Sequence, residues 1–285
     1  MAALIQDPRI LGTGHAVPAS VRLNEDPYFD AYRKLNAGKT ESQLFEGYAK
    51  RHFLAEGESV IDLMVEASRM AMREAGVEPS QIDMLIGDAS ISDYLVPNGI
   101  SLVHKKLGLS EATWPLAVTS AFSQFNAAVM MADALIRAGR ATYVLIALGD
   151  NWTGFVNADT QQALSAADGA AACVVGPRRD AAGWSLVDSR TKVAGQYYGG
   201  MKMVGDPVAG TPVTFTKPYF QIGAEGVAGF KDFAMVEAQN LAIEQLKATP
   251  GLQQVDGKWA DLCFICHQAS SVLIDTWVKA IGPEN

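Results

Sequence analysis

The stretch AVTSAFSQFNAAVMMADALIRAG, from Ala117 to Gly139, changes its hydrophobic pattern partway along. It begins like the end of a buried strand and then repeats apolar residues at helical spacing. The helical face consists of Phe125, Ala128, Val129, Ala132, Leu135 and Ile136. The pattern predicts a strand that turns directly into a helix through a tight corner at residues 120–123. Enzymes often place a nucleophile at such a corner, and here its tip reads Ser-Ala-Phe-Ser.

Apolar runs alternate with helical stretches on both sides of this corner. Strands are predicted at RILGTGHAVP, DMLIGDAS, WPLAVTS, TYVLIALGD and GAAACVVG, and a helix at SVIDLMVEASRMAMREAG, ended by Gly76. Strands that alternate with helices of about ten or more residues predict an α/β fold with a mainly parallel sheet.

A short repeat indicates that this fold is duplicated. The letters MVEA occur at Met64–Ala67 and again at Met235–Ala238, each inside an amphipathic helix. QIDMLIGDAS follows the first copy and WADLCFICHQAS the second, so helix, linker, Asp, apolar strand and Ala-Ser recur in one order. We therefore predict two related halves, residues 1–180 and 181–285, the second opening near GWSLVDSR (residues 183–190). The Gly- and Pro-rich residues 195–229 are expected to form a long excursion that is part of a substrate channel.

The second half is predicted to lack the elements that would complete its sheet. HQASSVLIDTWVKAIGPEN is expected to be a helix that ends near Gly282 and Pro283, where the sequence stops. An unfinished sheet leaves a strand edge uncovered. Two explanations stay open: the sequence continues beyond Asn285, or a partner covers the edge.

Composition narrows the classes of function. The 285 residues carry a formal net charge of −8, which argues against nucleic-acid binding, and 49% of them are hydrophobic, enough for a large core. The three cysteines do not form a disulfide framework, which favours a reducing compartment. The N-terminus does not resemble a signal peptide, and no apolar run approaches the ~20 residues of a membrane span. The prediction is a soluble cytoplasmic protein without membrane insertion.

A duplicated α/β chain with this corner and a later His-Gln-Ala resembles the thiolase fold, and within it the β-ketoacyl-acyl carrier protein synthase III family. The similarity is carried by ILGTGHAVP, EGYAKRHF, AADGAAACVV and FICHQAS. It implies a layered αβαβα fold, incomplete here at the C-terminus. It also implies a homodimer that condenses an acyl thioester, from coenzyme A or a carrier protein, with malonyl carrier protein in fatty acid or polyketide biosynthesis.

The resemblance also assigns positions at the site. In the family a corner Cys takes up the acyl group, and a His and an Asn stabilise the enolate. The His falls on His267 and the Cys position on Phe122, whereas the Asn and a Gly-rich oxyanion loop would follow Asn285. The family's Trp and Arg for the coenzyme A adenine fall on Glu41 and Phe45.

Phe122 is not a nucleophile, and we expect its ring to fill the space of an acyl-cysteine, facing His267. Two alternatives stay open for Ser123. It is either the residue that carries the acyl group in place of a Cys, with His267 as its base, or a helix cap. The same two alternatives apply to Ser120. His267 either donates from its neutral imidazole to a thioester carbonyl or is a core histidine between the halves.

Other motifs favour ordinary structural roles. Cys263 and Cys266 lie three apart on a predicted strand, so they point to opposite faces and form neither a redox pair nor a metal clamp. No metal and no cofactor are predicted, and the G-x-G of GTGHAV is a weak nucleotide signal. Asp168 and Gly169 are expected to shape a turn before a core strand. DYLVPNG (residues 93–99) is either the family loop that reaches toward the neighbouring site or an ordinary turn.

Three hypotheses for the function follow. The first, which we favour, is a synthase III-like acyltransferase or condensing enzyme without Cys-dependent self-acylation. The second is a catalytically silent subunit beside an active relative. The third is a module that binds an acyl carrier protein or a fatty acyl ligand without turnover.

Overall fold

The computed structural model describes residues 7–92, 97–120, 122–177, 184–204, 219–249, 251, 254–255, 258–259, 262–268 and 270–282. Contacts between Cα atoms divide the chain into two compact units. Unit 1 comprises Met1–Leu23, Lys50–Gly154 and Ala166–Leu186, and unit 2 comprises Asn24–Ala49, Phe155–Ser165 and Val187–Asn285. The predicted halves, residues 1–180 and 181–285, have different boundaries from these units and stay a prediction.

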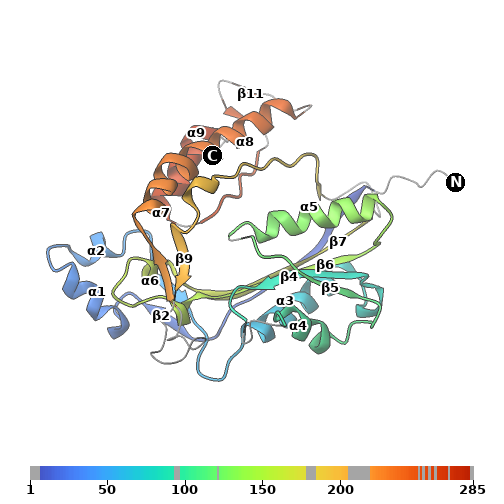
Figure 1. Ribbon diagram of the computed structural model, residues 1–285, viewed down its shortest axis with the longest axis horizontal. Coiled ribbons are helices and arrows are strands. Elements are labelled where there is room, and N and C mark those ends of the chain that lie inside the picture. The colour runs from blue at the N-terminus through green and yellow to red at the C-terminus, as the bar shows by residue number, and fades with distance from the viewer. Residues whose placement is uncertain are drawn as a thin grey trace. The chain divides into compact units, whose positions relative to one another are not determined.

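A six-stranded sheet with the strand order β5-β4-β6-β7-β1-β8 forms the centre of unit 1 (Figure 1). Its strands are β1 (Pro8–Ala16), β4 (Met84–Ala89), β5 (Trp114–Ala117), β6 (Val144–Asn151), β7 (Asp168–Pro177) and β8 (Trp184–Ser185). Strand β4 pairs in parallel with β5 and β6, whereas β7 runs antiparallel to β6 and β1, and β8 runs antiparallel to β1. The prediction of a mainly parallel sheet is therefore wrong. Between β6 and β7 the chain forms only short helical turns, which do not carry it back across the sheet.

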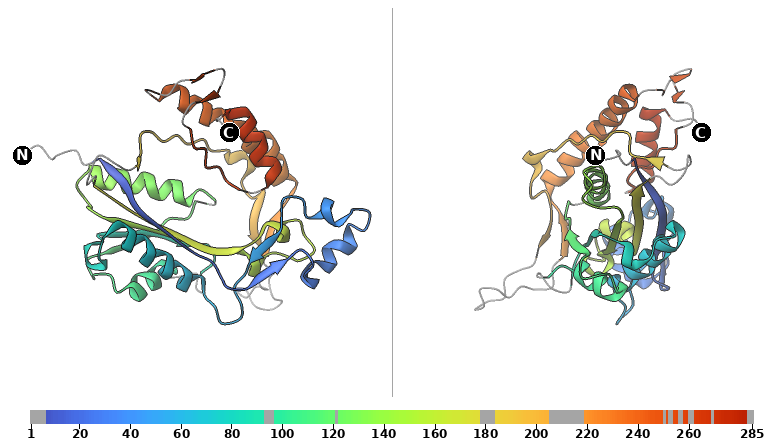
Figure 2. Two further views of the ribbon diagram at one scale, coloured as in Figure 1. Left: turned by 180° about the vertical axis from the view of Figure 1, so that it is seen from behind. Right: turned by 90° about the vertical axis from the view of Figure 1, so that its right-hand side faces the viewer.

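Helices cover both faces of this sheet. Helices α3 (Val60–Ala75) and α4 (Ile100–Leu107) lie on one face and α5 (Gln124–Arg137) on the other, as Figures 1 and 2 both show. Each face has its own buried core, one formed with α3 and α4 and the other with α5. The predicted face of α5 is confirmed for Ala128, Ala132 and Ile136, which are fully buried. Phe125 was expected on that face but is 46% exposed, because it lies at the corner end of the helix.

Two glycines of β1 explain the G-x-G motif by packing. A Cβ atom on Gly12 would lie 2.4 Å from the backbone oxygen of Ala71, and one on Gly14 would lie 2.1 Å from that of Ala67. Both alanines belong to α3, so the glycines let this helix approach the strand closely. Helix α3 begins after the N-cap Ser59, whose side chain accepts from the Ile61 amide, and ends at left-handed Gly76, as predicted. Unit 1 also contains the paired strands β2 (Val21–Leu23) and β3 (Lys50–His52).

Unit 2 consists of short elements around two small hydrophobic cores. Its helical elements are η1 (Pro27–Phe29), α1 (Asp30–Leu35), α2 (Glu41–Leu44), α6 (Gln162–Ser165), η4 (Gly195–Tyr197), α7 (Ala224–Gly229), the π-helical turn η5 (Phe230–Ala234), α8 (Met235–Ala248) and α9 (Ser271–Ile281). Its strands form two antiparallel pairs, β9 (Met201–Val204) with β10 (Tyr219–Ile222) and β11 (Gln254–Val255) with β12 (Lys258–Trp259). Two further turns are η2 (Pro79–Gln81) in unit 1 and η3 (Trp152–Phe155), which passes from unit 1 into unit 2. The predicted excursion at residues 195–229 thus contains η4, the β9–β10 pair and α7 within its described part.

The second copy of the repeat is confirmed in its helices but not in its strand. Helix α8 contains the second MVEA, and α9 begins after the N-cap Ser270 and ends at left-handed Gly282. Between them, residues 262–268 are irregular, so the predicted strand in LCFICHQ is wrong for this described part. Burial still alternates from Leu262 to His267, as in a strand, but these residues form no ladder with another described segment. Of the segment predicted to open the second half, Trp184 and Ser185 instead pair with β1 in unit 1.

Candidate functional site: the corner at the carboxyl ends of parallel strands

The predicted corner lies at the carboxyl end of β5, next to the same ends of β4 and β6. Residues 118–120 follow the strand, and α5 begins at Gln124. The Ser123 amide donates to the Ser120 carbonyl over 2.9 Å, which closes a tight turn. Phe122 has φ = 64°, the one positive φ of a non-glycine residue among the described residues. A bulky side chain there is an outlier in backbone conformation, as is typical of strained functional sites.

The two serine hydroxyls of the corner bond to each other and to the turn. Ser123 Oγ donates to the Ser120 carbonyl over 2.6 Å, and the two Oγ atoms lie 2.9 Å apart. Ser123 holds the N-cap position of α5, but its side chain makes no capping hydrogen bond. The helix-cap alternative is thus wrong for the Ser123 side chain, because its hydroxyl turns back to the residue that begins the turn.

Phe122 is held by an aromatic neighbour, Trp152, the first residue of the turn η3 that follows β6. Its ring stacks on that of Trp152, with centroids 5.7 Å apart and planes 24° apart. The Trp152 indole N–H donates to Asp150 Oδ1 over 3.1 Å, and the Ser90 hydroxyl donates to the same oxygen. Phe122 remains 53% exposed. A connected set of side chains, Ser90, Asp150, Trp152 and Phe122, therefore joins the carboxyl ends of β4, β6 and β5.

Ser90, Asp150 and Trp152 were not predicted as site residues. Their signal was available, because DAS and GDNW stand at the ends of two buried strands, and polar residues at the carboxyl ends of parallel strands commonly line a site.

Asp168 and Gly169 do not form the predicted turn before a core strand, because they are the first residues of β7 and pair with Asn151 and Asp150 of β6. Asp168 has a structural role. Its buried carboxylate accepts from the Leu54 amide over 2.8 Å and from the Thr153 amide over 2.9 Å.

His267 lies in unit 2, in the irregular residues 262–268, and its side chain is exposed. Because Phe122 belongs to unit 1, the predicted facing of these two side chains stays a prediction, as does the proton-accepting role of His267. All three cysteines are free thiols. Cys263 is exposed and Cys266 half-buried, in keeping with their predicted opposite directions.

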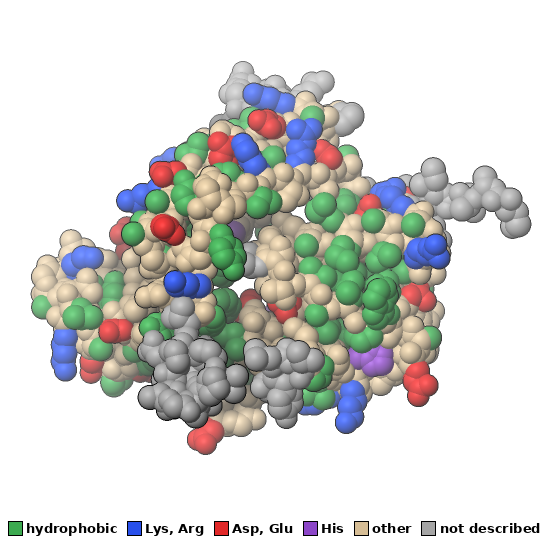
Figure 3. Space-filling model, in the orientation of Figure 1, with side chains coloured by type: hydrophobic (Ala, Val, Ile, Leu, Met, Phe, Trp, Pro, Cys, Tyr) green, Lys and Arg blue, Asp and Glu red, His purple; other side chains and the backbone are tan. Residues whose placement is uncertain are grey.

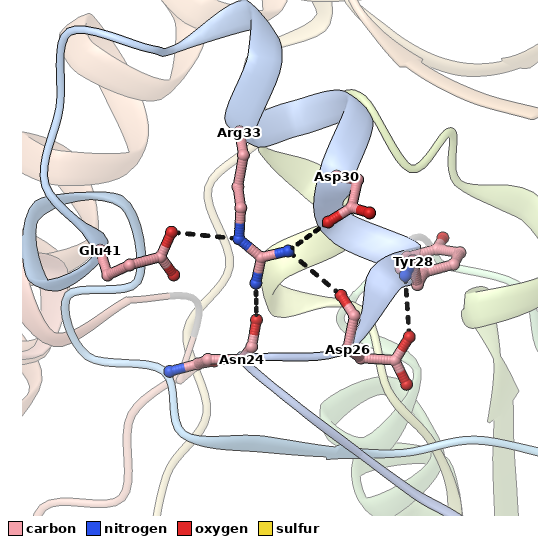
Figure 4. A network of polar contacts seen from close by, with 6 residues as sticks. All are labelled: Asn24, Asp26, Tyr28, Asp30, Arg33 and Glu41. Atoms are coloured by element: carbon pink, nitrogen blue, oxygen red, sulfur yellow. Dashed lines mark hydrogen bonds and ion pairs between the residues drawn. The ribbon is translucent and has the colours of Figure 1, made fainter.

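The two positions assigned to adenine recognition have structural partners in unit 2 (Figure 4). Glu41 accepts from Arg33 Nε over 3.1 Å, and Arg33 also donates to Asp30 and to the carbonyls of Asn24 and Asp26. Phe45 is 5% exposed and packs edge-on against Phe29. A buried phenyl ring and an ion-paired carboxylate do not present a stacking face or a cation to an adenine nucleotide.

Unit 2 also contains a polar pocket of about 270 Å³ beside the first turn of α9. Its lining residues include Lys39, Gln43, Gln161, Ser270 and Ser271.

Among the described residues, no group of three or more His, Cys, Asp or Glu side chains is placed to hold a metal ion. No helix within the described ranges has both the length and the apolar character of a membrane span. Of the DYLVPNG loop, residues 93–96 lie outside the described residues.

Comparison with known proteins identifies similar sequences. The family model of 3-oxoacyl-[acyl-carrier-protein (ACP)] synthase III matches residues 117–195, which contain the corner, β6 and β7. The β-ketoacyl-[acyl-carrier-protein] synthase III of Neisseria meningitidis serogroup C / serotype 2a is 27% identical over 279 residues, covering 98% of this chain and 82% of the relative. The enzyme of the same name from Thiobacillus denitrificans is 27% identical over 277 residues, covering 96% of this chain and 81% of the relative.

Solved structures share the fold. The priming β-ketosynthase of the R1128 polyketide pathway aligns with a TM-score of 0.79 at 21% identity, over 100% of this chain and 81% of that one. A lauroyl-CoA-bound variant of OleA from Xanthomonas campestris aligns with a TM-score of 0.77 at 19% identity, over 99% of this chain and 83% of that one. These neighbours have the thiolase fold, which confirms the predicted fold class.

Proposed function

This chain is a thiolase-fold relative of the 3-oxoacyl-[acyl-carrier-protein] synthase III family, and from that kinship we propose that it is a condensing enzyme or acyltransferase of fatty acid or polyketide biosynthesis. Its substrates are acyl thioesters of coenzyme A or an acyl carrier protein. The observation that carries the proposal is the strand-to-helix corner at residues 120–123, which lies inside the matched segment and keeps a strained tip. Three free thiols are in keeping with work in the cytoplasm.

The chemistry at this corner differs from that of a Cys enzyme. In a thiol enzyme the helix N-terminus would stabilise a thiolate at the tip. Phe122 has no group that can attack a carbonyl carbon, so the chain forms no thioester there. We assign His267 the role of donating to the thioester carbonyl or its enolate.

A condensation assay tests this function. The protein is incubated with an acyl-CoA and malonyl carrier protein, and the carrier is analysed by intact mass for the β-ketoacyl product. We expect product from the unmodified chain and about 100-fold less from His267→Ala, because one positioned donor contributes roughly that factor. Equal rates for the two proteins would exclude His267 as a catalytic residue, and absence of product from both would contradict the enzymatic proposal.

The second hypothesis, a silent subunit in a heterodimer, is favoured by the surface of unit 1. Strand β5 is at the edge of the six-stranded sheet, and its first residue, Trp114, is 61% exposed. Figure 3 shows hydrophobic side chains gathered over the part of unit 1 that contains β5 and α5. An exposed edge strand with large apolar side chains is typical of a protein interface. The partner in this proposal is a related condensing enzyme that has a nucleophile.

A further inference from the structure

Three serine hydroxyls lie at or near the corner, and they differ in where their protons point. Ser123 donates to the Ser120 backbone carbonyl, and Ser120 shares a hydrogen bond with Ser123. Ser90 instead donates to a carboxylate, Oδ1 of Asp150. A hydroxyl needs an adjacent base to become a nucleophile, and a carboxylate accepts a proton far more readily than a backbone carbonyl does.

The Asp150 carboxylate is itself held in place. The Trp152 indole N–H donates to the same Oδ1 over 3.1 Å, and the Ser90 amide donates to the Gly149 carbonyl over 2.9 Å. Nucleophile, base and a third group that orients the base form the arrangement that recurs in acyl-transfer enzymes. Here the three groups come from two neighbouring parallel strands, β4 and β6, through the residues at and just beyond their ends.

The site is also accessible and adjoins the corner. Ser90 is half-buried and Asp150 is exposed, so a substrate reaches the hydroxyl from solvent. The Trp152 ring stacks on Phe122, which places the Ser90–Asp150 pair one side chain away from the corner tip. The Ser90 hydroxyl therefore adjoins the corner, where the proposed acyl thioester binds.

We propose that Ser90 is the acyl-accepting residue of this chain, with Asp150 as its proton acceptor and Trp152 as the residue that positions Asp150. This inference rests on the proposed action on acyl thioesters. Ser90 Oγ attacks the thioester carbonyl carbon, and its proton passes to Asp150. The carbon–sulfur bond then breaks, an ester forms on Ser90, and the departing thiolate takes the proton from Asp150. A carboxylate is a weaker base than imidazole, so acylation is slow compared with that of a Cys enzyme.

Site-resolved mass spectrometry after incubation with hexanoyl-CoA tests the assignment. We expect one hexanoyl group on the unmodified protein, stable to neutral hydroxylamine as an ester is, and located on Ser90 by peptide mapping. Ser90→Ala abolishes this adduct, whereas the matched control Ser123→Ala retains it. Asp150→Asn slows its formation about 100-fold, because the proton acceptor is lost. Trp152→Phe keeps a stacked ring but loses the indole N–H, and slows acylation while thermal stability stays unchanged.

Each other result overturns the inference. An adduct on Ser123 or on a cysteine, persistence of the adduct in Ser90→Ala, or no adduct on the unmodified chain would exclude Ser90 as the acceptor. Equilibrium binding of hexanoyl-CoA to Ser90→Ala separates this failure from failure of the proposed function. If hexanoyl-CoA binds but no acyl group is transferred, thioester recognition stands and only the role of Ser90 is excluded. If the unmodified protein does not bind hexanoyl-CoA, both the role of Ser90 and the proposed function are contradicted.

Discussion

Phe122 is a bulky residue in a backbone conformation that favours glycine. A left-handed backbone costs an L-residue roughly 1–2 kcal/mol, and stacking on Trp152 offsets that only in part. The identity of the residue could be read from the sequence, but its φ of 64° could not, because it is imposed by the turn between β5 and α5.

A pair of substitutions isolates this strain. Phe122→Gly and Phe122→Ala both remove the ring, but only glycine adopts a positive φ without a steric penalty. We expect the glycine variant to be more stable than the alanine variant by about 1 kcal/mol in urea unfolding. Equal stability, or a more stable alanine variant, would show that the corner is not left-handed at this residue.

Cys173 gives a prediction about pH. Burial in the core between α5 and the sheet raises the pKa of its thiol to about 12, from an ordinary value of 9.0. A raised folded-state pKa means that this contribution to stability is complete below pH 9 and is lost as the pH rises toward 12. We expect the free energy of unfolding to fall over this interval, and to fall less steeply in Cys173→Ala. Identical pH profiles for the two proteins would contradict a buried neutral thiol.

At the scale of elements, hydrophobic periodicity predicted α3, α5, α8 and α9 and the main strands of unit 1 correctly. It did not predict strand direction, because β7 is as apolar as a parallel strand although it runs antiparallel to both of its neighbours. It also predicted a strand at residues 262–268, where burial alternates as expected but no described neighbour supplies a ladder. Alternation reports which face is buried, not whether a partner strand is present.

The close packing of α3 against β1 can be tested by substituting a glycine of the strand. A methyl group on Gly14 would lie 2.1 Å from the Ala67 carbonyl, whereas one on Gly154 of unit 1 would meet nothing within 4 Å. We expect Gly14→Ala to lower the free energy of unfolding by about 2 kcal/mol or more, and Gly154→Ala to change it by less than about 0.5 kcal/mol. A tolerated Gly14→Ala would mean that the helix packs further from the strand than described.

For the whole molecule, the expected homodimer with β5 at its interface predicts a change of oligomeric state. Trp114→Glu places a charge on the exposed edge strand, and we expect it to shift the protein toward monomer in sedimentation velocity. Val193→Glu is the matched control, because Val193 is 82% exposed in unit 2 and lies far from β5 in sequence. The proposal fails if both variants sediment like the unmodified chain.

The whole-molecule assignment depended on motifs more than on periodicity. The segments AADGAAACVV and FICHQAS indicated the family, whereas Ser90, Asp150 and Trp152 emerged only when the carboxyl ends of β4 and β6 were brought together. A hydrogen bond between residues 60 positions apart leaves no trace in local sequence pattern. The absence of a thiol at the corner, by contrast, was predicted by aligning a single residue, Phe122, with the Cys position of the family.

The most direct test of the account is restoration of the thiol. Phe122→Cys and the unmodified chain are incubated with an acyl-CoA, and intact mass is recorded before and after neutral hydroxylamine, which removes thioesters but leaves esters. We predict a hydroxylamine-labile acyl group on residue 122 of the variant and no hydroxylamine-labile acyl group on the unmodified protein. A thioester on the unmodified chain, or a Phe122→Cys variant whose new thiol reacts no faster than the other three, would contradict it.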